Sequence, residues 1–239
     1  LELSVGYDLE GIRSPRMHRF LGGIRDTGAR LERLRRDLPE PFAELADPAA
    51  TPVDPQLVRM TNLSTFHGCP PGEIEDIVRH LMTEHGLDVT VKLNPTLLGL
   101  ETVASILHDR LGYHDVRLDP EAFAEDLQFD RALELIDGLD SFARARGRRF
   151  GVKLTNTLVV ANDRGVLPGQ RMYLSGKPLH ALAVALARRL ADALPGRLLT
   201  DDGAGSIPVA FSAGIDKSNL ADVVAAGLEP VTICSALLR

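Results

Sequence analysis

The apolar positions of this chain follow two spacings that alternate along its length. Short apolar runs bounded by turn residues predict β-strands, and apolar residues three or four positions apart predict amphipathic helices between them. The clearest helix is Gly72–His85, which follows Pro70-Pro71 and ends before Gly86. Its apolar stripe consists of Ile74, Ile77, Val78, Leu81 and Met82.

This pattern yields strands and helices in alternation, together with two segments that fit neither. The predicted strands are Leu1–Val5, Val58–Ser64, Val89–Leu93, Gly151–Leu154, Ile207–Phe211 and Val231–Cys234. The other predicted helices are Ser14–Gly28, Glu101–Leu111, Phe129–Arg146, Pro178–Leu194 and Ser218–Ala226. Ser14 is the expected cap of the first helix, with Pro15 at its first position. The charged, proline-rich segment Ala29–Pro55 is predicted to be a surface insertion, and Tyr113–Ala124 to be a loop.

Short strands separated by helices indicate parallel βαβ units. We therefore expect an α/β fold, a (β/α)8 TIM barrel that is incomplete at its N-terminus, with a doubly wound open sheet as the alternative. A near repeat favours the barrel, because Val91–Leu97 and Val152–Leu158 both run from a strand into Lys, Asn and Thr side chains. Barrels build their sites from polar groups at the carboxyl ends of strands. Two ordinary strands that run into turns are the simpler interpretation of the same repeat.

Composition narrows the class of protein. With 239 residues, 44% hydrophobic and 25% charged, the chain suits one large globular domain. A net charge of −6 argues against a nucleic-acid or anionic-membrane surface, and no apolar run approaches the roughly 20 residues of a membrane span. Two cysteines fit a reducing cytoplasm and exclude an iron–sulfur cluster built from this chain alone. The first residue is not Met, so we expect a piece of a longer protein.

A dense polar turn follows the second strand and precedes the Gly72–His85 helix. It contains Thr65, His67 and Cys69. A helix N-terminus lowers a thiol pKa, which would make Cys69 reactive, although a thiol packed beneath the helix is the favoured interpretation. His67 is either a proton-transfer residue or a side chain that bonds the loop backbone. A third and fourth ligand at metal spacing are missing, so we predict no metal site.

Two strand-to-helix turns with small residues lie near the C-terminal end. Ser212-Ala213-Gly214 follows one strand, and Val231–Cys234 runs into Ser235. Such turns aim backbone N–H groups at a phosphate, and barrels often place a phosphate site after their last two strands. The chain also uses 23 Arg but only 4 Lys, and both Lys92 and Lys153 lie on predicted strands. One explanation for their placement is that a compact charge is needed near a phosphate or a reduced ring, and the other is chance.

These motifs resemble a known family over nearly the whole chain. The matching segments are GYDLEGI (Gly6–Ile12), LSTFHGCPPGEIE (Leu63–Glu75), VKLNPTLLG (Val91–Gly99), GVKLTNTL (Gly151–Leu158) and LPGQRMYLSG (Leu167–Gly176). They resemble the barrel of the YgfK family, which carries the label selenate reductase, and more distantly the FMN barrels of dihydropyrimidine dehydrogenase and dihydroorotate dehydrogenase. The resemblance implies an FMN barrel inside a larger redox protein, whose other parts would carry FAD, NAD(P)H and 4Fe–4S clusters. Nothing in these residues selects selenate.

The resemblance also implies roles for individual residues. Asn62 and Asn156 would hydrogen-bond the flavin ring or the substrate beside it, and Lys92 would lie near the pyrimidine edge of the flavin. Asn94 and Thr157 would face the substrate. The ribityl phosphate would be held by Ser175, Gly176, Ala213, Gly214, Cys234 and Ser235.

Three positions depart from the family pattern. Thr65 stands where the dehydrogenases have their general acid, a Cys or Ser. Ala213 replaces a glycine, and Lys153 has no basic counterpart in dihydropyrimidine dehydrogenase. The first hypothesis is therefore an FMN-dependent oxidoreductase domain that takes electrons from a partner module and passes hydride to a small heterocycle. Thr65, His67 or Cys69 would supply the proton. The alternatives are a flavin-less scaffold that docks redox partners and, third, a barrel that forms a Schiff base on Lys92 or Lys153.

Overall fold

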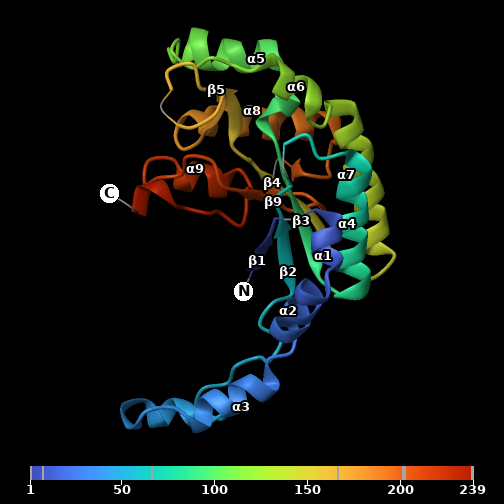
Figure 1. Ribbon diagram of the computed structural model, residues 1–239, viewed down its shortest axis with the longest axis vertical. Helices are drawn as coiled ribbons and strands as arrows, with labels where there is room; N and C mark the ends of the chain where they lie inside the picture. Colours follow the sequence, from blue (N-terminus) through green and yellow to red (C-terminus); the bar gives the residue numbers. More distant parts are fainter. Residues whose placement is uncertain (1, 7, 66, 166, 201–202, 238–239) are drawn as a thin grey trace.

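A parallel sheet with strands in chain order forms the centre of the molecule. The computed structural model describes residues 2–6, 8–65, 67–165, 167–200 and 203–237. The sheet contains β1 (Glu2–Val5), β2 (Met60–Leu63), β3 (Asp88–Leu93), β4 (Phe150–Leu154) and β9 (Val209–Phe211), each parallel to the next (Figure 1). A doubly wound sheet reverses its strand order at a switch point. This sheet does not reverse, so the doubly wound alternative is wrong, and the strands form an arc of a barrel that is not closed.

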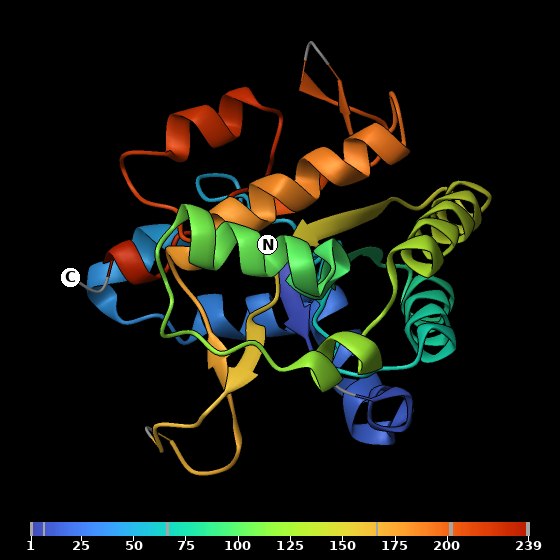
Figure 2. The same ribbon diagram turned by 90° about the horizontal axis from the view of Figure 1, so that it is seen from above.

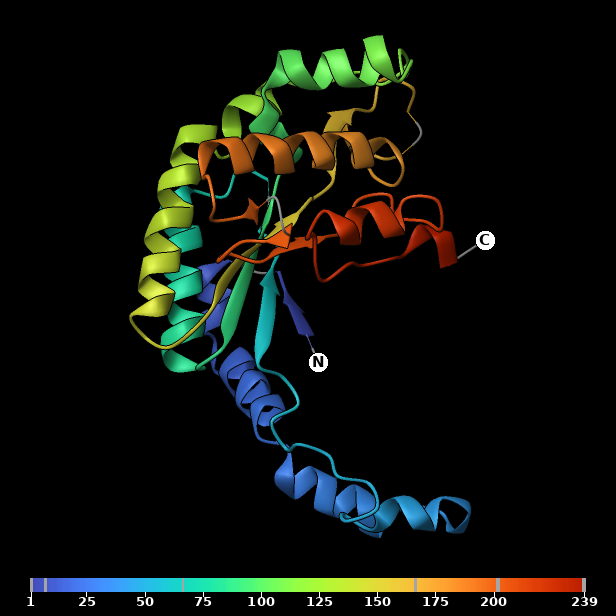
Figure 3. The same cartoon turned by 180° about the vertical axis from the view of Figure 1, so that it is seen from behind.

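Helices cover one face of this arc. Figure 3 shows α4 (Pro71–Glu84) and α7 (Phe129–Arg144) side by side against the sheet, while α8 (Pro178–Ala193) crosses beyond the strand ends. The five apolar residues predicted for the first of these helices are all buried, as the 3.6-residue period requires. The core therefore lies between the sheet and its helices, which leaves the opposite face for the side chains that alternate with core residues along each strand.

An arm leaves this body after the first strand. α1 (Leu9–Arg13) still packs on the body, with Ile12 in the core, and α2 (Pro15–Arg25) follows it. The α2 cap Ser14 accepts a 3.2 Å hydrogen bond from the Met17 N–H, as predicted. The predicted single helix ends at Arg25, and α3 (Gly28–Arg36) and the 3₁₀-helix η1 (Glu40–Ala46) continue outward without a buried residue. Figures 1 and 3 show that this part of Ala29–Pro55 projects away from the sheet.

Two helical predictions need correction. The predicted helix Glu101–Leu111 is divided into α5 (Leu100–Ala104) and a π-helix, η3 (Ser105–Arg110). The predicted loop Tyr113–Ala124 contains the start of α6 (Pro120–Glu125), whose first turn is capped by the Asp119 carboxylate. This helix has only six residues, which is too short to show a periodic apolar stripe.

The structure also contains elements that the apolar pattern did not predict. The 3₁₀-helix η2 (Pro95–Leu98) follows β3, and two antiparallel hairpins join β5 (Leu158–Ala161) to β6 (Arg171–Leu174) and β7 (Leu199–Thr200) to β8 (Gly203–Ala204). Figure 2 shows the β5–β6 hairpin extending to one side of the molecule.

The last sequence-predicted strand is mostly irregular. Within the described part of Val231–Cys234, a single bridge joins Val231 to Phe211. The preceding Pro230 lacks an N–H, and Thr232 is exposed, so this segment lies at the edge of the sheet and cannot extend its pairing far. The helix start predicted after it is the 3₁₀ turn η4 (Ser235–Leu237). Helix α9 (Leu220–Ala225) precedes it, within the predicted range.

Two glycines provide a matched test of how tightly the sheet packs. A Cβ added to Gly151 in β4 would lie 3.0 Å from the Pro208 carbonyl oxygen and 3.1 Å from Thr90 Oγ1, whereas one added to Gly138 on α7 would contact nothing within 4 Å. We expect Gly151→Ala to lower the free energy of unfolding by about 1–3 kcal/mol. Gly138→Ala should raise it by about 0.5–1 kcal/mol, because alanine favours the helix. Urea unfolding followed by circular dichroism measures both, and a Gly151→Ala protein as stable as the parent would contradict this packing.

Candidate functional site

The carboxyl ends of the strands meet at one edge of the sheet. Backbone hydrogen bonds continue beyond the strands, since the Asn156 N–H donates to Leu93 O at 2.8 Å and the Ser212 N–H donates to Leu154 O at 2.6 Å. The residues that follow β3, β4 and β9 are therefore held side by side. This edge is where a barrel builds its site.

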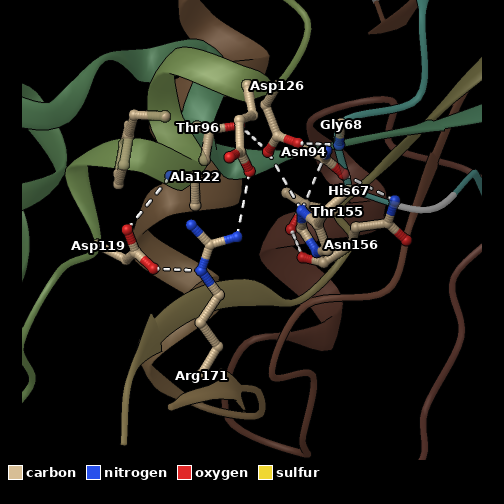
Figure 4. A network of polar contacts seen from close by, with 12 residues as sticks. His67, Gly68, Asn94, Thr96, Asp119, Ala122, Asp126, Thr155, Asn156 and Arg171 are labelled. Atoms are coloured by element: carbon tan, nitrogen blue, oxygen red, sulfur yellow. Dashed lines mark hydrogen bonds and ion pairs between the residues drawn. The ribbon is translucent and has the colours of Figure 1, made fainter. Parts of the chain in front are cut away.

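A chain of polar side chains links four segments at this edge (Figure 4). Asn156 Nδ2 donates a 2.8 Å hydrogen bond to Asn94 Oδ1. Asn94 Nδ2 lies 3.4 Å from His67 Nδ1, and that nitrogen lies 3.2 Å from Asp126 Oδ2. The structure thus brings together Asn94, Asn156 and His67, three of the residues predicted from the sequence, and adds the carboxylate of Asp126.

Asp126 fixes the orientation of His67. Its carboxylate is almost wholly buried and accepts 2.8 Å hydrogen bonds from the Gly68 N–H and from Thr96 Oγ1. Burial acts to raise the pKa of Asp126, but the hydrogen bonds from His67, Thr96 and Gly68 outweigh it and hold that pKa below its ordinary value. An ionised carboxylate only accepts hydrogen bonds, so His67 carries a proton on Nδ1 and leaves Nε2 for chemistry.

The β5–β6 hairpin lies over this network. The ring of Tyr173 stacks on that of His67, with centroids 5.7 Å apart and planes 23° apart. Arg171 on the same strand forms ion pairs with Asp119 at 2.6 Å, Glu125 at 3.1 Å and Glu121 at 3.2 Å. These contacts fasten the hairpin to α6 and its cap and place an aromatic ring at the site.

The predicted proton donors differ sharply in their surroundings. Thr65 and Cys69 line a small pocket that also contacts Lys92, Asn94 and Asp126. Cys69 is buried in the core, and this burial, with a smaller contribution from Glu73, raises its thiol pKa to about 12. This burial supports the favoured interpretation, a thiol packed beneath the helix, because desolvation outweighs the helix N-terminus in setting the thiol pKa. Thr65 is half-buried.

Lys92 and Lys153 are partners in the register of β3 and β4. Lys92 is half-buried, and burial together with the neighbouring Lys153 charge lowers its pKa. On the adjacent strand, Asn62 is buried and its Oδ1 has no hydrogen-bond partner in the described part of the protein. Buried acceptors without partners are rare, so this oxygen is available to a ligand.

The two glycine loops pack against each other at the start of α8. A Cβ on Gly214, whose φ is +57°, would lie 2.7 Å from Gly176 O, so only glycine fits there. His180 Nδ1 lies 3.0 Å from Ala213 O. In the described residues no acceptor is found for the N–H groups of Gly176, Ala213 and Gly214, which suits an anion. Lys177, however, forms a 3.0 Å ion pair with Asp216 and is not a free phosphate ligand.

The remaining predicted ligands are less clearly placed. Ser175 is exposed next to the glycine loop, and Thr157 is half-buried between β4 and β5. Cys234 is exposed, and no backbone hydrogen bond among the described residues joins it to the Ala213-Gly214 turn. Ser235 begins η4, but its side chain lies outside the described residues. The described part of the chain contains no cluster of three or more His, Cys, Asp or Glu that could hold a metal ion.

The sequence interpretation missed Asp126, Tyr173 and Arg171. Asp126 lies 59 positions from His67, in a segment without a periodic pattern, so no local signal marks it. Tyr173 and Arg171 belong to a hairpin whose connection is nine residues long and carries no short turn motif. Only the segment LPGQRMYLSG drew attention to that region.

The buried carboxylate of Asp126 predicts how the stability of the protein depends on pH. Because the pKa of Asp126 is lower in the folded protein, its stabilising effect is complete above about pH 4 and is lost as pH falls further. We expect Asp126→Asn to lower the free energy of unfolding at pH 7 by about 1–3 kcal/mol and to flatten its decline in acid. Urea unfolding at several pH values measures this, with Asp192→Asn on the exposed face of α8 as control. Parallel pH profiles for parent and Asp126→Asn would contradict the assignment.

Comparison with known proteins places the chain in a family. The family described as oxidoreductase YgfK, N-terminal TIM-barrel domain, matches residues 1–239. The YgfK proteins of Escherichia coli strain K12 and of Escherichia coli O157:H7 are each 38% identical to the chain over 255 residues, covering 99% of it and 24% of the relative. The chain therefore spans about a quarter of the length of these relatives. None of the helices in the described residues has both the length and the apolarity that crossing a membrane requires. The chain belongs to the YgfK N-terminal TIM-barrel domain family of oxidoreductases.

Proposed function

We propose that this domain is an FMN-dependent oxidoreductase domain that passes hydride to or from a small heterocyclic substrate. One observation carries the proposal. The register pair Lys92 and Lys153 and the amide pair Asn94 and Asn156 lie at the ends of the same two strands, in the part of a barrel where cofactors bind.

The residues of the site fit FMN in three respects. The partnerless Oδ1 of Asn62 is a buried acceptor, and the pyrimidine ring of a flavin offers an N–H donor. Lys92 provides a positive charge near that ring. The free backbone N–H groups of Gly176, Ala213 and Gly214, beside the start of α8, suit a terminal phosphate. The acceptor, the cation and the phosphate-binding amides therefore match the chemical groups of one ligand.

Bound FMN would supply reversible hydride transfer, and the protein would supply charge, orientation and protons. Lys92 would favour the negative charge that the ring acquires on reduction. Asn94 and Asn156 hold each other at 2.8 Å and would present amide groups to a substrate ring. His67 would give or take a proton at Nε2, while Asp126 stabilises its protonated form. Tyr173 would help to exclude water from above.

Electrons would come from outside this domain. The chain matches only about a quarter of the length of the YgfK relatives, so an electron-transfer module with FAD, NAD(P)H and 4Fe–4S clusters would belong to the rest of such a protein. The edge that carries the site would then have to remain accessible to both substrate and electron donor.

A second candidate is a flavin-less barrel that docks redox partners. The residue that favours this candidate is Asp216, two positions after Gly214 in the sequence. Its carboxylate forms a 3.0 Å ion pair with Lys177. Hydrogen bonds from Ser218 and Lys177 lower the pKa of Asp216, so it carries a negative charge close to the proposed phosphate site. The FMN content of the purified protein distinguishes the two candidates.

The flavin proposal predicts the cofactor content of the protein. We expect the complete natural polypeptide that contains these residues to release about one FMN per chain on heating. Lys92→Met removes the charge beside the ring and keeps the side-chain length. It should weaken FMN binding by about tenfold or more, since about 1.4 kcal/mol corresponds to a factor of ten. Chromatography separates FMN from FAD, and quenching of flavin fluorescence gives the dissociation constant.

Arg188→Met is the matched control, because it removes an exposed cation on α8 that is paired with Asp192. It should bind FMN as the parent does. A well-folded parent protein that contains FAD but no FMN, and binds none when it is added, would reject the flavin proposal and leave the docking scaffold.

A further inference from the structure

Lys92 and Lys153 form a lysine pair without a counter-ion in the described part of the chain. Lys153 is about nine-tenths buried, with only 6% of its surface exposed, and its Nζ donates a 3.1 Å hydrogen bond to Thr232 Oγ1. Among the described residues, no Asp or Glu forms an ion pair with Lys153 or with Lys92 beside it. Buried charges in proteins are normally paired. Two neighbouring lysines without an acid are therefore a feature that folding alone does not explain.

The two lysines point away from the hydrophobic core. Lys153 alternates with Val152 and Leu154, which are both buried among the core residues. Successive side chains of a strand face opposite sides of the sheet, so Lys153 lies on the face opposite the helices. Its register partner Lys92 shares that face. This is the inner face of the barrel arc.

Other hydrogen-bond donors gather at the same place. Ala210 is the register partner of Lys153 on β9, and Ser212 follows directly after the end of that strand. Ser212 Oγ is buried and has no partner among the described residues. Thr232 lies beside the end of β9, where its N–H donates to Phe211 O at 2.8 Å. Because Thr232 Oγ1 accepts from Lys153, its own hydroxyl proton is free to donate.

We infer that Lys153, Lys92, Ser212 and Thr232 form a binding site for an oxyanion, such as the carboxylate of an organic substrate. The cluster combines two ammonium groups with two hydroxyls, and Lys153 Nζ already lies within hydrogen-bonding distance of Thr232 Oγ1. Thr232 is exposed and Lys92 is half-buried, so a small molecule can reach the cluster from solvent. The inference rests on the proposed function in one respect, since it describes the substrate of that site as a small organic acid.

The two lysines are separate from the proposed phosphate loops, whereas Ser212 begins the turn that carries Gly214. Lys92 and Lys153 lie within β3 and β4, whereas Gly176 and Gly214 lie in turns that follow β6 and β9. Lys92 would stand between the flavin and the anion. Lys153 would distinguish acidic substrates from neutral ones.

The test is anion-dependent stability without any flavin or substrate. Sodium acetate and inorganic phosphate are added separately to the complete protein in a low-salt buffer, and acetamide serves as the uncharged counterpart of acetate. We expect the Tm of the parent to rise with acetate and saturate, and to stay unchanged with acetamide. Lys153→Met should weaken the apparent affinity for acetate by about tenfold or more, and Ser212→Ala by several-fold.

The variants also separate a binding role from a structural one. Without acetate, Lys153→Met should have a higher Tm than the parent, because it replaces an unpaired buried charge with an apolar side chain of similar length. Acetate should reduce that difference. Arg188→Met should keep the acetate response of the parent. An acetate response that Lys153→Met retains, or a parent without any response, would overturn the inference.

Two further readouts keep this result independent of the flavin proposal. FMN content is measured on the same samples, and loss of the acetate response in Lys153→Met supports the anion site whether or not FMN is present. A phosphate response that survives in Lys153→Met, while the acetate response is lost, assigns that phosphate to the glycine loops and also supports a separate carboxylate site. A protein that responds only to phosphate would overturn the carboxylate assignment.

Discussion

The parallel register of β3 and β4 is the constraint on which the rest of the structure depends. It aligns Val91 with Val152 on the helix side and Lys92 with Lys153 on the other, and it ends both strands at the same level. The close approach of Pro208 and Thr90 to Gly151 leaves no room for a side chain at this junction. A shift of one residue would turn the lysines into the core, so the packing of the core also fixes the position of the charges.

This register divides the molecule into a helix-covered side, which supplies stability, and a polar edge, which carries the candidate site. On the helix side, α4 and α7 bury apolar side chains and supply stability. At the carboxyl edge and on the inner face lie an imidazole held by a buried carboxylate and, as far as the described residues show, a lysine pair without an acid and a buried amide oxygen without a donor. Local departures of this kind are typical of sites that bind ligands.

Three chemical groups at the edge divide the work of the proposed reaction. The lysines supply positive charge, the amides of Asn94 and Asn156 supply orientation, and His67 supplies the proton. Burial raises the pKa of the Cys69 thiol, which makes Cys69 a weaker candidate for this proton transfer than His67. The hairpin that carries Tyr173 connects this chemistry to α6 through Arg171, so an exposed cluster of ion pairs determines how the aromatic ring lies over His67.

The sequence by itself determined the order of strands and helices, the apolar face of α4 and the polar strand ends at Asn94 and Asn156, because these depend on local periodicity. It missed α6 and the β5–β6 hairpin, and it extended the Val231 strand too far, since short elements carry little periodic signal. Only the tertiary structure decided that Asp126 holds His67 from 59 positions away and that burial, rather than the helix N-terminus, sets the thiol pKa of Cys69. Those outcomes depend on burial and on long-range contacts, which no single stretch of sequence encodes.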